Sequence, residues 1–135
     1  MRPLVLDTNV VLDAFVFGDA AAQPLHQGLL AGRLQWLATA AMREELERVL
    51  AYPQLARRLA ATGAAPGDVL AAFDRHAQPV PPAPRAGLVC RDPDDQKFID
   101  LAVARRAGLL SKDRAVLALR KRLAAAGIRV APTLD

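Results

Sequence analysis

Four acidic residues, spread over the length of the chain, are candidates for chemistry: Asp7, Glu45, Asp95 and Asp113. Asp7 ends a short apolar run at residues 4–6, and Asp113 follows a second run at 109–111. The functional crevice of an open parallel sheet lies beyond the carboxyl ends of its strands, so we expect both aspartates at one sheet edge. Asp is also a common helix N-cap, and capping is the alternative interpretation of each.

Asp95 is expected to face inward from a helix. It lies three and four residues before Phe98 and Ile99, which places it on the apolar face of a helix that begins near Pro93. Asp92 and Asp94 are expected to cap or solvate the first turn of that helix. A buried carboxylate is costly without a partner, so Asp95 is the acid that most requires a ligand.

Glu45 borders the buried stripe of another predicted helix, whereas Glu44 and Glu47 point away from it. A carboxylate in this position is also explained by an ion pair at the rim of the core, with Arg43 or Arg48 as the partner. Both interpretations of Glu45 remain open at this point.

Carboxylates that lie close together raise one another's pKa values, and such a cluster persists most readily where a cation neutralises it. Oxygen ligands without nearby His or Cys select Mg²⁺ or Mn²⁺ over Zn²⁺. His26 and His76 fall in other predicted helices and are interpreted as surface or rim residues. One or two such ions would support hydrolysis of a phosphodiester, with Asp7 as the predicted bridging ligand in a two-ion site.

The elements that must position these acids follow from apolar periodicity and turn signals. Strands are predicted at residues 3–6, 34–38, 109–111 and 128–130, with a further short strand or a turn at 88–90. Helices are predicted after residue 7 and at about 20–32, 39–51, 55–61, 66–77, 93–107 and 113–126. Four prolines make 78–85 an extended surface segment. This alternation predicts a three-layer α/β/α fold around a mainly parallel sheet of four to five strands.

Composition limits the class of protein. A chain of 135 residues with 53% hydrophobic content fits one domain over residues 1–135. Its apolar runs are shorter than the roughly 18 residues of a transmembrane helix, and its start lacks a signal-peptide core, so we expect no membrane association and a cytoplasmic location. A single cysteine, Cys90, permits neither an intramolecular disulfide nor a thiolate zinc cage. The formal charge of +4, dominated by arginine, favours phosphate contacts.

Four segments together resemble the signature segments of PIN-domain nucleases, and most of all the VapC-like toxin components of bacterial toxin–antitoxin systems: Leu6-Asp7-Thr8-Asn9, Glu45-Leu46, Asp92-Pro93-Asp94-Asp95 followed by Phe98, and Ser111-Lys112-Asp113. The resemblance runs from about residue 3 to residue 131. It implies a PIN-like α/β/α fold, endoribonuclease activity that depends on Mg²⁺ or Mn²⁺, RNA as substrate, and an antitoxin partner that blocks the active site.

The resemblance also implies residue roles. Asp7, Glu45, Asp95 and Asp113 fall on its acidic, metal-binding positions, while Asn9 and Ser111 fall on polar positions that support Asp7 and Asp113 by hydrogen bonding. Basic residues beside these segments are candidate phosphate contacts: Lys112, Arg114, Arg85 and Arg91. The apolar run at 10–17 and the helical insertion at 53–77 are candidate surfaces for the antitoxin or for a homodimer. Burial in the protein's own core is the alternative use of the first, and the one that we favour.

Three other functions compete with this one. Asp7-Thr8-Asn9 resembles the start of haloacid-dehalogenase-like phosphatases, but their second acid is replaced by Asn9. A receiver-like signalling domain requires paired acids after the first strand and a lone lysine near the last, an order that this chain does not have. A PIN-like module that binds RNA or a protein without cleaving it is the third alternative.

Overall fold

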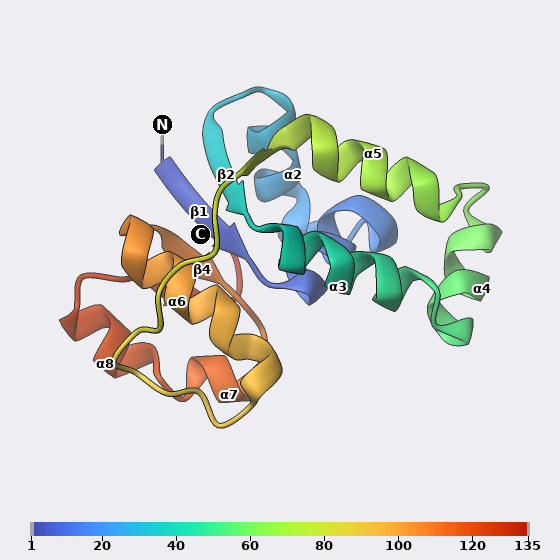
Figure 1. Ribbon diagram of the computed structural model, residues 1–135. Coiled ribbons are helices and arrows are strands. Elements are labelled where there is room, and N and C mark those ends of the chain that lie inside the picture. Colours follow the sequence, from blue (N-terminus) through green and yellow to red (C-terminus); the bar gives the residue numbers. More distant parts are fainter. Residues whose placement is uncertain (1, 135) are drawn as a thin grey trace.

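A five-stranded parallel sheet forms the centre of the computed structural model, which describes residues 2–134 (Figure 1). Its strands are β1 (Arg2–Leu6), β2 (Leu34–Ala38), β3 (Ala77–Pro79), β4 (Gly108–Leu110) and β5 (Val130–Ala131). They lie in the order β3-β2-β1-β4-β5, and each neighbouring pair is parallel. The expected parallel sheet of four to five strands is therefore confirmed.

The strand order reverses at β1. The chain passes from β1 to β2 and β3 on one side, and then returns to place β4 and β5 on the other side of β1. Val5 and Leu6 pair with Leu109 and Leu110, so the carboxyl ends of β1 and β4 lie next to each other. In open α/β sheets this switch point is where ligands bind. Asp7 and Asp113, which were expected at one edge of the sheet, follow these two strands.

Helices cover the sheet as two groups (Figure 1). The first group comprises α1 (Thr8–Leu12), α2 (Gln23–Leu30), α3 (Ala40–Leu50), α4 (Pro53–Ala61) and α5 (Pro66–His76). The second comprises α6 (Gln96–Arg105), α7 (Arg114–Leu117) and α8 (Arg120–Ala125), of which α6 contacts β1 and β4. The sheet therefore lies between two helical layers, as the alternation of elements predicted.

Apolar residues of the sheet and of both helical groups form one core. Leu4, Val5 and Leu6 of β1 are buried because the central strand is covered on both faces, which explains its unbroken apolar run. Trp36 of β2 and Phe98 of α6 are also fully buried. Among residues 2–134 no helix combines the length and the apolar character that crossing a bilayer requires.

Several predicted helices are interrupted. The predicted helix at 93–107 begins with a 3₁₀ turn at Pro93–Asp95 before α6, and the one at 113–126 is divided into α7 and α8. The helix that begins after residue 7 continues as a π-helical turn at Asp13–Phe17 and ends at Gly18, whose φ of 59° suits glycine. A 3₁₀ turn at Ala20–Ala22 precedes α2. Local periodicity does not register such breaks, because both halves keep their apolar faces toward the core.

Two expectations about extended segments need correction. Residues 88–90, predicted as a short strand or a turn, form no strand: Leu88 lies in a bend, and Val89 and Cys90 have no regular structure. The extended segment expected at 78–85 begins as the edge strand β3, in which Gln78 pairs with Leu37 and Pro79 with Ala38. Pro79 is compatible with this position because a proline, which has no N–H to donate, fits a sheet only at its edge.

Candidate functional site

Asp7 stands directly after β1 and is almost completely buried. Its backbone N–H extends the pairing of β1 and β4 by donating to the carbonyl of Leu110 at 3.0 Å. One carboxylate oxygen accepts from the Ser111 hydroxyl at 2.6 Å, and the other accepts from the Asn9 backbone N–H at 2.8 Å. Asp7 is therefore the N-cap of α1 and also a carboxylate held rigidly at the switch point.

Burial raises the pKa of Asp7 above its usual value. The hydrogen bonds from Ser111 and Asn9 act in the opposite direction, while the nearby carboxylates of Asp113 and Glu45 add to the rise. The structure thus brings Asp7 within electrostatic reach of the other three predicted acids: Asp113, Glu45 and Asp95.

Asp92, Asp95 and Asp113 each offer a carboxylate oxygen to one group, and these oxygens all lie within 4.8 Å of one another. Asp113 is placed here as the N-cap of α7, where it accepts from the Ala115 N–H at 2.8 Å. Asp92 caps the 3₁₀ turn by accepting from the Asp94 N–H at 3.0 Å. The capping interpretation of Asp92 was right but incomplete, because its side chain also faces two other acids.

Asp95 has the most unusual surroundings of these acids. Its residue is only 9% exposed, and its Oδ2 atom is buried without a hydrogen-bond partner in the described part of the chain. Burial raises its pKa to about 7, and three neighbouring aspartates contribute to the rise: Asp113, Asp7 and Asp92. A buried, unsatisfied carboxylate oxygen that faces other carboxylates is the environment that a hard divalent cation would neutralise.

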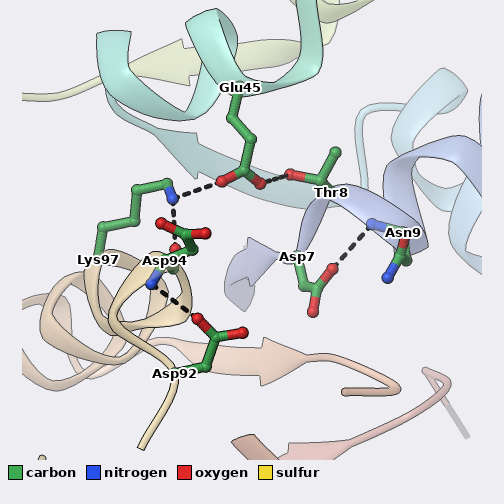
Figure 2. A network of polar contacts seen from close by, with 7 residues as sticks. All are labelled: Asp7, Thr8, Asn9, Glu45, Asp92, Asp94 and Lys97. Atoms are coloured by element: carbon green, nitrogen blue, oxygen red, sulfur yellow. Dashed lines mark hydrogen bonds and ion pairs between the residues drawn. The ribbon is translucent and has the colours of Figure 1, made fainter. Parts of the chain in front are cut away.

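Glu45 lies beside this group rather than in it. One of its oxygens forms an ion pair with the Lys97 ammonium at 2.6 Å, and the other accepts from the Thr8 hydroxyl (Figure 2). The ion-pair interpretation of Glu45 was right in kind but wrong in partner, because Arg43 pairs instead with Asp74 at 2.8 Å.

Sequence reasoning missed three participants, namely Thr8, Asp92 and Lys97. Asp92 and Thr8 adjoin predicted segments, so their positions in the sequence were a usable signal. Lys97 carried none, because it contacts Glu45 across 52 positions of sequence through the packing of α6 near α3.

Ser111 and Asn9 support the site in different ways. The fully buried Ser111 donates to Asp7 and accepts from the Asp113 backbone N–H at 3.1 Å, so one hydroxyl links both strand-end aspartates. Asn9 contributes its backbone N–H to Asp7, while its residue is exposed.

Of the predicted phosphate contacts, Lys112 forms an ion pair with Asp13 at 2.5 Å. The remaining three are exposed: Arg85, Arg91 and Arg114. His26 and His76 are half-buried against the ring of Phe15 at centroid distances of 4.9 and 6.1 Å, and neither belongs to the acid group.

Comparison with known proteins agrees with this geometry. Residues 3–115 match a family described as PIN domain. Among the solved structures, the chain is similar to one from the crystal structure of VapBC2 from Rickettsia felis bound to a DNA fragment from their promoter, with a TM-score of 0.64 and 14% sequence identity. That match covers 96% of this chain and 97% of the other. No curated protein matches the sequence.

Proposed function

The chain belongs to the PIN-domain family, and from this premise we propose that it is a metal-dependent endoribonuclease that hydrolyses phosphodiester bonds of RNA. The observation that carries the proposal is the buried Asp95 oxygen without a partner, which faces other carboxylates at the switch point of the sheet. Structural ion pairs do not explain it, because its described neighbours are acids rather than bases.

The donor set fits Mg²⁺ or Mn²⁺, one or two ions, because it consists of carboxylate oxygens. The ligands proposed from the sequence are four acids: Asp7, Glu45, Asp95 and Asp113. Asp92 is added to them by its place in the acid group, whereas Glu45 lies beside that group in contact with Lys97 and Thr8. A bound ion would lower the pKa of a water and offset the charge on the leaving oxygen.

The protein's own residues prepare these carboxylates for that task. Ser111 and the Asn9 N–H fix Asp7, the proposed bridging ligand, in one orientation. Capping bonds do the same for Asp92 and Asp113. Ligands held before the ion arrives need little reorganisation, and this preorganisation favours both affinity and catalysis.

Basic residues that adjoin the acid-bearing segments in the sequence are the proposed phosphate contacts. Arg85, Arg91 and Arg114 are exposed and follow or precede the acid-bearing segments in the chain. Lys112 adds a fourth cation next to Asp113, although Asp13 pairs with it in the free protein. Such contacts position the RNA backbone without reading its bases.

The test is cleavage of single-stranded RNA by purified protein with Mn²⁺ or Mg²⁺, repeated with EDTA and with Asp7→Asn. We expect cleavage to require both the metal and Asp7. Asp74→Asn is the matched control, because it removes the same carboxylate from an exposed ion pair with Arg43. Cleavage that persists under EDTA and in Asp7→Asn would contradict the carboxylate mechanism. RNA binding in the presence of metal but without cleavage would favour the PIN-like binding module.

We further propose that this ribonuclease is the toxin of a toxin–antitoxin pair that acts in the cytoplasm, with an antitoxin protein as partner. The resemblance of the four acidic segments and the similarity in fold to a chain of VapBC2 support this assignment. Induced expression in a bacterial host is expected to arrest growth, whereas expression of Asp7→Asn to the same level is not. Equal arrest by both proteins would contradict the toxin assignment. The predicted homodimer is tested separately by light scattering.

A further inference from the structure

Lys97 is a cation placed at the edge of the acid group. It lies in the first turn of α6, two residues after Asp95, and its ammonium reaches Glu45 on α3 at 2.6 Å (Figure 2). The side chains of Lys97 and Glu45 are 26% and 17% exposed, so this pair is more shielded than an ordinary surface ion pair. Two elements that carry different parts of the site are thereby connected by one contact.

The ammonium is held from more than one side. Besides Glu45, it donates to the carbonyl of Asp94 at 2.5 Å, and it lies over the ring of the buried Phe98 at 4.9 Å from the centroid. An ammonium has three donors, and two of them are committed here. The side chain of Lys97 is therefore ordered by the 3₁₀ turn and the start of α6, and Glu45 is the group that it orients.

Both oxygens of Glu45 are engaged by these neighbours. Oε1 meets Lys97 and Oε2 accepts from Thr8, whose backbone follows directly after Asp7. The group of carboxylate oxygens within 4.8 Å of one another comprises Asp92, Asp95 and Asp113 and does not include Glu45. Lys97 and Thr8 together fix the orientation of Glu45 beside that group.

We propose that Lys97 is a positioning residue that keeps Glu45 outside the inner group of metal ligands and offsets part of the charge of the site. The inference rests on the proposed function, because it assigns a role within the same site. Glu45 then acts from beside the ion, on water or on the RNA, while Asp92 belongs to the inner group of carboxylates.

Mn²⁺ affinity, measured by calorimetry in the absence of RNA, tests this arrangement. Lys97→Met removes a positive charge beside the site, and we expect it to tighten Mn²⁺ binding by roughly threefold to tenfold, the effect of one partly solvated charge near a divalent ion. Glu45→Gln is expected to weaken binding by about the same factor. In the double variant the two changes should cancel, leaving affinity close to that of the native protein.

A direct ligand behaves differently from a neighbouring charge. Asp95→Asn is expected to weaken Mn²⁺ binding by at least about tenfold more than Glu45→Gln does, because it removes an inner carboxylate. With saturating Mn²⁺, Lys97→Met should still cleave RNA with a kcat reduced about tenfold or more, since Glu45 has lost its orientation. A residue that only stabilised the fold would not tighten metal binding while it lowered kcat.

Two variants control for charge and folding. Arg43→Met removes a cation from the other ion pair of α3, and it should leave Mn²⁺ affinity unchanged. Lys97→Arg retains the charge and should keep native affinity. Thermal unfolding of each metal-free variant, followed by circular dichroism, identifies any that fail to fold. If Lys97→Met does not fold, the inference is tested by the kcat of Lys97→Arg, which should fall less than tenfold.

The inference is overturned if Lys97→Met fails to tighten Mn²⁺ binding, or if Glu45→Gln weakens it as strongly as Asp95→Asn. It is also overturned if the double variant binds as weakly as Glu45→Gln alone, because Glu45 would then be a ligand in its own right. The proposed function fails separately. If the Mn²⁺ affinities follow the expected pattern and the native protein does not cleave RNA, only the nuclease assignment is wrong.

Discussion

Asp74 on α5 and Asp95 at the start of α6 carry the same carboxylate in opposite surroundings. Asp74 is exposed and receives two hydrogen bonds from the Arg43 guanidinium, at 2.8 and 3.0 Å, which lower its pKa. Asp95 is buried, one of its oxygens has no partner within residues 2–134, and burial together with other carboxylates raises its pKa to about 7. The aspartate far from the switch point has a basic partner, whereas the aspartate at the switch point keeps one oxygen unpaired among other carboxylates.

RNA cleavage should show the largest difference between Asp95 and Asp74. Asp95→Asn should reduce kcat/KM for RNA cleavage by at least roughly 100-fold, the upper end of what even indirect ligand contacts contribute. Asp74→Asn should leave it unchanged, because the Arg43 pair lies outside the site. Initial rates at saturating Mn²⁺ measure both values. Comparable losses in the two variants would show that the acids at the switch point have no special role.

Metal binding should separate the two aspartates by stability as well. Saturation with Mn²⁺ at about 100 times its dissociation constant stabilises a folded protein by about 2.7 kcal/mol. The native protein and Asp74→Asn should both show this gain as a rise in Tm, whereas Asp95→Asn should lose most of it. Differential scanning calorimetry with and without Mn²⁺ provides the measurement. A full Mn²⁺-dependent rise in Asp95→Asn would place the ion elsewhere.

The pH dependence of stability should also differ between the two aspartates, because their pKa values are shifted in opposite directions. Asp95 has a raised pKa, so its contribution to stability is fully present below the ordinary Asp value of 3.8 and is lost as pH rises through about 7. Asp74 has a lowered pKa, so its contribution is present above 3.8 and is lost as pH falls.

The corresponding measurement is urea unfolding of metal-free protein at pH 5 and pH 8. At each pH, the free energy of unfolding of the native protein is subtracted from that of Asp95→Asn. This difference should be larger at pH 8 than at pH 5 by on the order of 2 kcal/mol, after allowance for solvent screening. Asp74→Asn should show no such gain over this interval. If the stability of Asp95→Asn has the same pH dependence as that of the native protein, the pKa of Asp95 is not raised in the folded state.

Much of the fold was readable from local patterns. The strand at 34–38 coincides with β2, and the central run that ends at Leu6 coincides with the end of β1, because buried parallel strands are short apolar runs between turn signals. The edge strand β3 was missed, since its polar Gln78 and Pro79 join the sheet only through pairing with β2. That pairing depends on residues about 40 positions earlier in the chain, beyond the reach of local propensity.

The carboxylates at the strand ends divide in the same way. Asp7 and Asp113 were placed at one edge by sequence alone, because parallel strands bring their carboxyl ends together whatever the details of packing. Asp95 was predicted to face inward from its spacing to the apolar residues of α6, and its burial agrees with that prediction. Each of these inferences uses a periodicity or a strand end, both of which are local properties.

The partners of these acids depend on how elements far apart in the sequence pack together, which the tertiary structure shows. Lys97 contacts Glu45 because α6 and α3, which belong to different helical layers, come together at the switch point. Asp92 faces Asp95 and Asp113 because of the geometry of one 3₁₀ turn. A side-chain contact depends on the relative placement of elements to within about an ångström. The strand ends in the sequence were enough to predict which edge of the sheet carries the acids. The packing of the helices determines which acid has a basic partner and which acids face one another.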